Sequence, residues 1–217
     1  MGIRYPKDYT EKELEENAET LEKAVTIPVN IEIEAEHRVY DLSEMKEILS
    51  KADRIVLLDC GCRTDYGNCN APRDVCMNIG DAAEEALEMK RLNPRLINLD
   101  EALQTLERSH RTGLVHMAYT MKGDEVPTVI CSCCSCCCHT LGGLIRFGIA
   151  TEVLTSRYVA EDDEPKCIRC GVCVDRCTFN ARQLEDGDLL YDESQCFGCG
   201  LCVTTCPTET IKLVPRD

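Results

Sequence analysis

Residues 167–177 read Cys167-Ile-Arg-Cys170-Gly-Val-Cys173-Val-Asp-Arg-Cys177, and residues 196–207 read Cys196-Phe-Gly-Cys199-Gly-Leu-Cys202-Val-Thr-Thr-Cys206-Pro207. Both runs have the spacing C-x2-C-x2-C-x3-C. Three thiolates separated by two residues on a tight loop can converge on three irons of one cubane. The fourth cysteine begins a helix that leads it to a neighbouring cluster. The spacing therefore predicts two [4Fe–4S] clusters.

Through these runs, residues 161–217 resemble the bacterial two-cluster [4Fe–4S] ferredoxins. The resemblance implies a pseudo-twofold βαβ repeat around two clusters and low-potential transfer of single electrons. One cluster is expected on Cys167, Cys170, Cys173 and Cys206, and the other on Cys196, Cys199, Cys202 and Cys177. Thr178 stands where the family usually has proline. We expect a looser turn there but no lost ligand, because proline has no coordinating atom. A zinc site or a disulfide framework fits two repeated four-cysteine runs less well.

The composition limits the partners that the protein can have. The net charge of −15 argues against nucleic acid and against an anionic membrane, since both are bound by clustered Lys and Arg. An acidic surface suits a basic redox partner, although it can equally serve solubility alone. Aromatic residues make up only 5% of the chain, so we expect the clusters themselves to stabilise the C-terminal part.

The cysteine content indicates a reducing compartment. Eighteen cysteines without an apolar export signal at the start favour metal binding over disulfides and predict a cytoplasmic protein of an anaerobic setting. No apolar run reaches membrane-spanning length, so no membrane insertion is expected. No GxGxxG or Walker A run indicates a dinucleotide or ATP. The sequence predicts no particular oligomeric state.

Apolar periodicity predicts the elements upstream of the cysteine runs. Thr10 and Glu13 have the spacing of a capping box, Asp100 is the expected N-cap of its helix, and a hairpin turn is expected at Gly123-Asp124. A helix or turn is expected at 140–150. The predicted helices are 8–24, 43–51, 81–90 and 99–110, and the predicted strands are 25–34, 54–60, 114–119 and 125–131.

These elements predict an α+β protein of two domains. Residues 1–160 form a cysteine-rich α/β domain, in which two helices followed by a hairpin resemble a winged-helix segment. Residues 161–217 form the ferredoxin-like domain, and the acidic segment Glu161-Asp-Asp-Glu-Pro165 is the expected boundary. The acidic charge argues against DNA binding by the winged-helix-like segment, which leaves it as a scaffold.

The two runs account for eight of the eighteen cysteines, so ten remain. Each upstream group follows a predicted strand, so both can meet at one edge of a sheet. On an extended chain Cys60 and Cys62 point to the same side, as do Cys131 and Cys133. We therefore predict at least one further iron–sulfur cluster with ligands from both groups. The groups are Cys60, Cys62, Cys69 and Cys76, and Cys131, Cys133, Cys134, Cys136, Cys137 and Cys138.

Two alternatives for these ten cysteines stay open. One is a zinc site formed by Cys60, Cys62, Cys69 and Cys76, with the later run as a redox buffer. The other is a set of free thiols, which would oxidise one another readily. The C-x-C-R segment and the later cysteine run, ahead of a two-cluster domain, resemble poorly characterised ferredoxin-like proteins of anaerobes. That resemblance implies no specific activity.

Three further residues lie near these thiols or between predicted strands. Arg63 either stabilises thiolates or pairs with Asp59 or Asp65. His139 is a candidate ligand, although histidine is the less common ligand of iron–sulfur clusters. His116, in a predicted strand, is expected as a satisfied sheet histidine and not as a base.

The sequence thus supports two functions. The first is an electron-transfer protein or subunit that passes single electrons between the ferredoxin-type pair and an N-terminal cluster. The second is a ferredoxin-fed reductase that acts on a disulfide or another sulfur substrate at the N-terminal thiols. The absence of a recognisable acid–base constellation favours the first, and the surplus of thiols favours the second. A sensor that uses the winged-helix-like segment would need a basic face.

Overall fold

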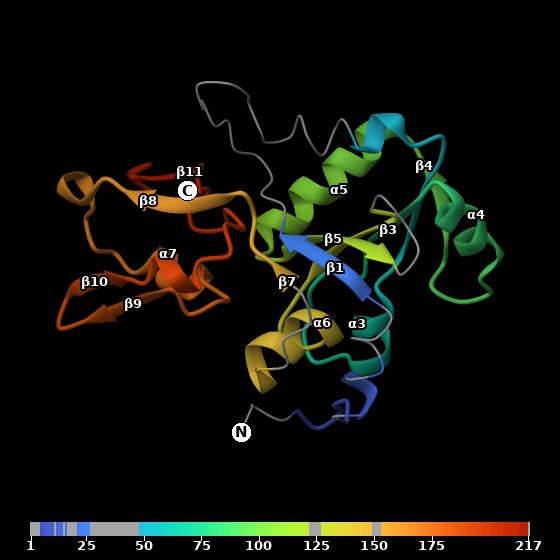
Figure 1. Cartoon of the computed structure of the whole chain (residues 1–217), viewed down its shortest axis with the longest axis horizontal. Coiled ribbons are helices and arrows are strands. Elements are labelled where there is room, and N and C mark those ends of the chain that lie inside the picture. Colours follow the sequence, from blue (N-terminus) through green and yellow to red (C-terminus); the bar gives the residue numbers. More distant parts are fainter. Residues whose placement is uncertain are drawn as a thin grey trace.

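The computed structural model describes residues 5–10, 12–14, 16, 21–26, 48–121, 127–148 and 153–216. Within these residues a large mixed sheet with its helices occupies one end of the molecule, and two small sheets occupy the other (Figure 1). None of the helices formed by these residues combines the length and the apolar character that crossing a bilayer requires.

The large sheet has the strand order β4-β2-β3-β6-β5-β1-β7. Its neighbouring strands are antiparallel, except that β7 runs parallel to β1. The strands are β1 (Leu21–Thr26), β2 (Ile55–Asp59), β3 (Asp74–Ile79), β4 (Arg95–Ile97), β5 (Val115–Met121), β6 (Val129–Cys133) and β7 (Val153–Leu154).

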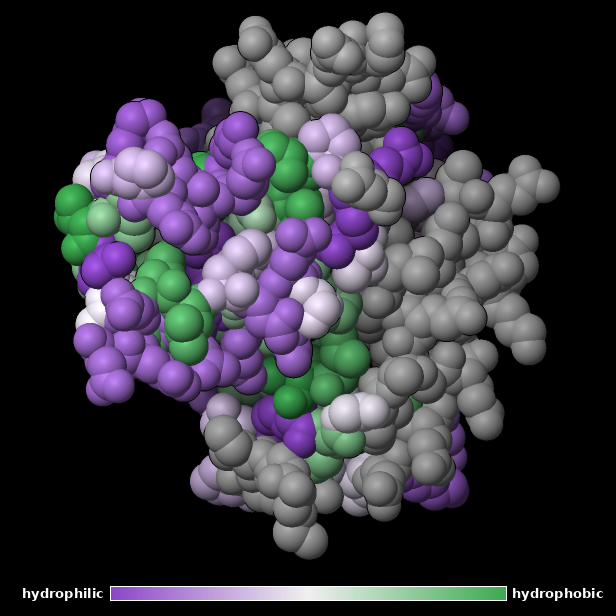
Figure 2. Space-filling model, turned by 60° about the vertical axis from the view of Figure 1, so that its left-hand side comes forward, coloured by the Kyte–Doolittle hydropathy of each residue, from purple (hydrophilic) through white to green (hydrophobic). Residues whose placement is uncertain are grey.

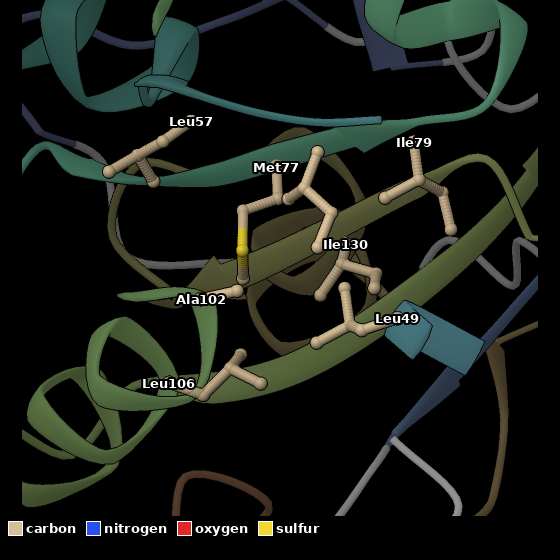
Figure 3. Close-up of a cluster of buried hydrophobic side chains, with 8 residues drawn as sticks. Leu49, Leu57, Met77, Ile79, Ala102, Leu106 and Ile130 are labelled. Carbon is tan, nitrogen blue, oxygen red and sulfur yellow. The ribbon is translucent and has the colours of Figure 1, made fainter. Parts of the chain in front are cut away.

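Alternation along β2 shows which helix covers which face of the sheet. Ile55 and Leu57 belong to the apolar core beneath α5 (Leu99–Arg111), which Figure 3 shows. Val56 packs against α4 (Asp81–Glu88) instead. Because successive side chains of a strand point to opposite faces, α5 and α4 lie on opposite faces of the sheet.

By the same alternation, Cys76 of β3 and Cys131 of β6 point to the face of the sheet opposite α5. Ile130 of β6 packs in the core beneath α5, so Cys131 takes the other face. Met77 of β3 likewise packs beneath α5, which turns Cys76 away from it. In Figure 1, α5 lies above the sheet, whereas α3 (Gly61–Tyr66) and α6 (His139–Gly142) lie below it. The π-helix η1 (Gly143–Phe147) continues α6.

The C-terminal part consists of two antiparallel strand pairs around short helices. Strand β8 (Tyr158–Asp162) pairs with β11 (Ile211–Pro215), and β9 (Arg182–Glu185) pairs with β10 (Asp188–Tyr191). The helices are α7 (Val172–Arg176) and the 3-10 turns η2 (Glu164–Lys166) and η3 (Glu193–Gln195). The predicted boundary after residue 160 falls within β8, and the division into two domains stays a prediction.

Several predicted elements are present with changed limits. The capping box is confirmed, because Thr10 N donates to Glu13 Oε2 (2.6 Å) and Glu13 N donates to Thr10 Oγ1 (3.3 Å). The predicted helix 8–24 is wrong at its end, since 21–26 pair with β5 as a strand. The predicted cap Asp100 is also wrong, because Asn98 Oδ1 accepts the bond from Glu101 N (2.9 Å). Residues 27–34 and 43–47 and the turn at 123–124 lie outside the described residues.

The winged-helix prediction is wrong. Strand β4 separates α4 from α5, and the β5–β6 pair lies inside the large sheet instead of forming a wing at its edge. Strands β3 and β4 were not predicted. Strand β3 was hidden because Asp74-Val-Cys-Met-Asn-Ile79 mixes polar and apolar residues without a clear alternation.

Candidate metal centres

Two cavities of similar size in the C-terminal part are each lined by four cysteines. The first has about 360 Å³ of empty space, its open mouth included, and is lined by Cys167, Cys170, Cys173 and Cys206. The second has about 350 Å³, measured in the same way, and is lined by Cys177, Cys196, Cys199 and Cys202. We call the first the outer cavity, since its Cys170 is exposed, and the second the inner cavity. Cys177 thus lines the inner cavity although Thr178 follows it.

The backbone repeats itself around the two cavities. A 3-10 turn precedes the first cysteine of each run, at 164–166 and at 193–195. Residues at equal offsets share positive φ angles, which L-residues rarely adopt. The pairs are Arg169 (53°) with Gly198 (68°), Gly171 (77°) with Gly200 (74°), and Asn180 (56°) with Glu209 (51°). Gly198 is also needed for space, because a Cβ there would stand 2.1 Å from Tyr158 O.

Hydrogen bonds support thiolates at the outer cavity. Thr210 N and Arg169 N donate to Cys206 Sγ and Cys167 Sγ, both at 3.4 Å. Although burial raises the pKa of the Cys206 thiol, hydrogen bonds from Thr210 and Thr208 lower it to about 7. A thiol with such a pKa is available as a thiolate ligand near neutral pH.

Arg182 lies between the two cavities and is 2% exposed. Its guanidinium donates two bonds of 2.8 Å to Asp162 and stands 4.0 Å from Cys173 Sγ of the outer cavity. It also contacts Cys202 of the inner cavity. Burial raises the pKa of the Cys202 thiol to about 12, and Arg182 opposes this rise. A single buried cation therefore faces ligand candidates of both cavities.

Six of the ten upstream cysteines form a closed ring of contacting thiols beneath the sheet. Each member contacts two others, in the order Cys60, Cys62, Cys138, Cys133, Cys131 and Cys76, and Cys76 contacts Cys60 again. Contacts from Cys62 and Cys76 lower the pKa of Cys60 to about 2, and contacts from Cys133 and Cys62 hold the pKa of Cys138 well below its usual range. We call this set the six-thiol ring.

The other four upstream cysteines form a separate, tighter group. The Sγ atoms of Cys69, Cys134, Cys136 and Cys137 all lie within 4.8 Å of one another. The Cys69–Cys134 and Cys136–Cys137 pairs are each 3.7 Å apart. We call this set the four-thiol group.

Arg63 lies beside both N-terminal sets and is 1% exposed. Its Nε donates to Cys134 Sγ (3.5 Å), Nη2 donates to Ser132 O (2.7 Å), and Nη1 donates to Pro72 O. Burial alone would lower the pKa of Arg63, but the charges of Cys60 and Cys134 raise it on balance. Asp65 pairs with Arg91 instead, so of the two predicted roles the structure supports the stabilisation of thiolates.

The N-terminal segment covers the thiols from one side. Asp8 forms a buried ion pair with Arg146 of η1 (2.9 Å), which anchors the segment. The ring of Tyr9 packs on His139 at 5.1 Å. His139 Nδ1 lies 3.3 Å from Cys62 Sγ, and its Nε2 lies 3.0 Å from the Tyr66 hydroxyl. Both nitrogens of His139 thus have neighbours, and the ring is oriented toward the thiols.

An apolar cluster connects the inner cavity with the six-thiol ring. Phe179 and Leu201 line the inner cavity and pack in one cluster with Cys133 and Cys138 of the ring. Cys177 and Cys199 of the inner cavity lie at the border of the same cluster. Phe179 also stacks on Phe197 at 4.3 Å. The inner cavity and the ring thus border one hydrophobic cluster.

The structure corrects two sequence-based groupings. The alternative zinc set of Cys60, Cys62, Cys69 and Cys76 is divided, because Cys69 lies in the four-thiol group and the others lie in the ring. Cys62 does not lie on an extended chain with Cys60 but in helix α3. Cys131 and Cys133 both lie in strand β6 and therefore point to the same side, as predicted. His116 is a buried sheet histidine, as predicted, and its Nδ1 bonds Ser132 Oγ (3.0 Å). The prediction that it is satisfied holds only in part, because among the described residues its buried Nε2 has no hydrogen-bond partner.

Sequence reasoning missed Arg182, Asn68 and Tyr119. Tyr119 places its hydroxyl 3.5 Å from Cys133 Sγ, and Asn68 Nδ2 donates to Cys136 O (3.0 Å). Arg182 had one detectable signal. It occupies the fifth position after the last cysteine of its run, where the second run has Ile211.

Comparison with known proteins identifies the C-terminal part. No curated protein matches the chain. Residues 166–210, which include all eight cysteines of the two runs, match the family model described as a 4Fe-4S dicluster domain. The C-terminal part of this chain is therefore a ferredoxin-like iron–sulfur domain.

Proposed function

We propose that the protein is an iron–sulfur electron-transfer protein that passes single electrons between a C-terminal pair of [4Fe–4S] clusters and an N-terminal cluster. The observation that carries the proposal is the shared apolar core, which contains both Phe179 and Leu201 of the inner cavity and Cys133 and Cys138 of the six-thiol ring. An electron-transfer chain requires such continuous packing between its centres. The N-terminal cluster is proposed for the six-thiol ring.

The assignment of ligands follows the cavities. Cys167, Cys170, Cys173 and Cys206 would hold one cluster, and Cys177, Cys196, Cys199 and Cys202 would hold the other. When bound, such clusters take up and release one electron at a time. Arg182 and the amides of Arg169 and Thr210 stabilise the negative charge of the thiolates, and the apolar walls exclude water.

The exchange of electrons with a partner is proposed at the outer cavity. Cys170 is exposed, and the neighbouring Ile168 is 61% exposed. Figure 2 shows apolar side chains among hydrophilic ones on the side of the molecule that carries the C-terminal part. A groove beside Cys167 is lined by five carboxylates and an arginine, namely Glu161, Asp162, Glu164, Asp188, Glu193 and Arg169. Three of these carboxylates form ion pairs, Glu161 with Lys212, Asp162 with Arg182 and Asp188 with Arg169. A basic redox protein in the same reducing compartment, the cytoplasm, fits this surface best.

A reductase is the second candidate, and the six-thiol ring favours it. A cubane uses four protein thiolates, so a ring of six leaves two for chemistry with a disulfide or another sulfur substrate. Cys62 of the ring contacts His139, a group that can hold or release a proton. This function also uses electrons from the C-terminal clusters, so it differs from the first only in its final acceptor.

Stepwise reduction of anaerobically purified protein, followed by EPR, tests the proposal. We expect the signals of the C-terminal pair and one further iron–sulfur signal, which disappears in Cys133→Ser and persists in Cys170→Ser. Because at most two of the six thiols are spare, unchanged iron–sulfur signals in Cys133→Ser, Cys60→Ser and Cys138→Ser alike would show that the N-terminal cluster is absent and that the protein is a two-cluster carrier alone. A change of the further signal on addition of a disulfide, with release of thiols, would favour the reductase.

A further inference from the structure

The four-thiol group has the dimensions of a site for one metal ion. A tetrahedral ion with metal–sulfur bonds of about 2.3 Å holds its four sulfurs about 3.8 Å apart. The measured pairs Cys69–Cys134 and Cys136–Cys137 are 3.7 Å apart, and all four sulfurs lie within 4.8 Å of one another.

This spacing distinguishes the group from a cluster cage. In a cubane each thiolate binds a different iron, so the four sulfurs stand farther apart than the sulfurs that share one ion. Among the described residues, no three sulfurs of the six-thiol ring lie as close to one another as the four sulfurs of this group. Two kinds of thiol site therefore lie side by side in the N-terminal part.

The surroundings of the four-thiol group are those of a built metal site. Arg63 Nε donates to Cys134 Sγ (3.5 Å), and Cys138 N donates to Cys134 O (3.1 Å), which fixes the turn that carries three of the sulfurs. Four thiolates and one divalent cation carry a net charge of −2, which the buried cation of Arg63 partly offsets. Hydrogen bonds of this kind orient the ligands of metal sites and are costly to remove.

The group also joins two segments that are distant in the sequence, and Asn68 links the N-terminal segment to them. Cys69 lies in the loop between α3 and β3, whereas the other three cysteines follow β6. Asn68, next to Cys69, donates from Nδ2 to Lys7 O and to Cys136 O, both at 3.0 Å. An ion here would fix the N-terminal segment and the loop against the turn after β6.

We propose that Cys69, Cys134, Cys136 and Cys137 bind a single divalent ion, Zn²⁺ or Fe²⁺, in a tetrahedral tetrathiolate site without sulfide. The site is structural, because all four positions around the ion are occupied by protein ligands. It holds the wall of the six-thiol ring in place through Cys134 and Arg63. The proposal does not depend on the electron-transfer function.

Metal and acid-labile sulfide analysis of the full chain, purified without oxygen, tests this site. A cluster contributes equal amounts of iron and acid-labile sulfide. We expect one further metal ion per chain beyond these equal amounts, either zinc or iron in excess over sulfide. Cys137→Ser should lose this ion and keep the sulfide-matched iron. The matched control Cys170→Ser should lose iron and sulfide together and keep the unmatched ion.

Two results would overturn the proposal. One is a wild-type protein whose only metal is iron equal to its sulfide. The other is a Cys137→Ser variant that loses iron and sulfide in equal amounts, since the group would then belong to a cluster. Should the variant not fold and the unmatched metal be zinc, X-ray absorption at the zinc edge of the wild-type protein identifies the atoms that bind the ion. Four sulfurs at about 2.3 Å support the site, and nitrogen or oxygen ligands contradict it.

These outcomes are separable from those of the proposed function. The electron-transfer proposal is tested by the amount of iron that is accompanied by an equal amount of sulfide. The four-thiol site is tested by the amount of metal in excess of sulfide. Loss of one result leaves the other unaffected.

Discussion

The two cysteine-rich parts of this molecule gather their thiols in opposite ways. In the C-terminal part the ligand candidates come from two short runs, and a repeated loop conformation brings each set together. In the N-terminal part the thiols come from residues 60–76 and 131–138, which meet only because β3 pairs with β6. Local spacing therefore specifies the first kind of site, and the whole sheet specifies the second.

The two parts also differ in what stabilises them. Five of the eight C-terminal ligand candidates belong to the core of that part, namely Cys173, Cys177, Cys196, Cys202 and Cys206. The core beneath α5 consists of aliphatic side chains such as Leu57, Leu106 and Ile130, with no cysteine among its described members. Metal binding should thus be coupled to folding much more strongly in the C-terminal part.

Removal of iron should have the largest effect. After anaerobic chelation we expect hydrogen-exchange protection in β8 and β11 to fall by at least about a thousandfold, or about 4 kcal/mol. Protection in β2 and β3 should fall far less, because the core beneath α5, in which Leu57 and Met77 pack, contains no ligand candidate, although Cys76 on the other face of β3 belongs to the six-thiol ring. Hydrogen exchange followed by mass spectrometry measures both regions in one sample. Equal loss of protection in both would refute the difference between the two parts.

The substitution Cys202→Ser should separate the two parts next most clearly. It removes one ligand candidate of the inner cavity, so we expect a loss of up to about four irons with their sulfide. The N-terminal signal should remain, while its reduction through the C-terminal part should slow by tenfold or more, an effect of about 1.4 kcal/mol. Rapid-freeze EPR measures this rate.

Cys170→Ser is the matched control, because Cys170 lines the outer cavity and is exposed. It should weaken electron uptake from a partner and leave the inner cluster in place. Disappearance of the C-terminal and N-terminal signals together in Cys202→Ser would show that the two parts are not separate.

Arg63→Met should change the N-terminal sites and leave the C-terminal clusters unchanged. The variant removes the cation that donates to Cys134 and acts on Cys60, so the reduced, more negative state loses stabilisation. We expect the N-terminal potential to fall by about 60 mV, a tenfold change for a one-electron couple. Arg63→Lys, which keeps the charge, should change the potential less. An EPR-monitored redox titration in which the C-terminal potentials shift equally would contradict this assignment.

The smallest effect concerns pH at the junction of the two parts. His110 stacks on His116 at 5.8 Å and contacts Thr204 of the C-terminal part (2.7 Å). Burial lowers the pKa of His110 to about 4, with a smaller contribution from Arg176. Burial lowers the pKa of His116 to about 3, with a smaller contribution from His110. Unfolded histidine has a pKa of about 6.5, so only the unfolded state takes up these protons below that value.

Stability at this junction should therefore be full above about pH 6.5 and fall as the pH decreases. At pH 5.5 we expect a loss of roughly 1 kcal/mol for each histidine. Denaturant unfolding of the metal-loaded protein at pH 7 and 5.5 measures this loss. In His110→Gln the loss should be about half as large, and an unchanged pH dependence in that variant would show that other groups cause it.

The sequence predicted the parts of this molecule that depend on short-range spacing. The ferredoxin-like runs, β2, α4 and α5 could be predicted because each pattern lies within about 20 residues. The division of the ten upstream cysteines into six and four could not, since Cys69 joins Cys134 only through the packing of a loop against a turn. Arg63 could be predicted as a candidate, but its choice of thiolates over Asp65 depends on the backbone oxygens of Pro72 and Ser132.

The most direct test of the account is the amount of iron and acid-labile sulfide per chain in anaerobically purified protein. Two cubanes contain about eight irons. The account predicts clearly more than eight irons matched by sulfide, because the six-thiol ring holds a further cluster. Eight irons with eight sulfides, and upstream thiols that all react with an alkylating reagent, would contradict it and leave the N-terminal part without a cluster.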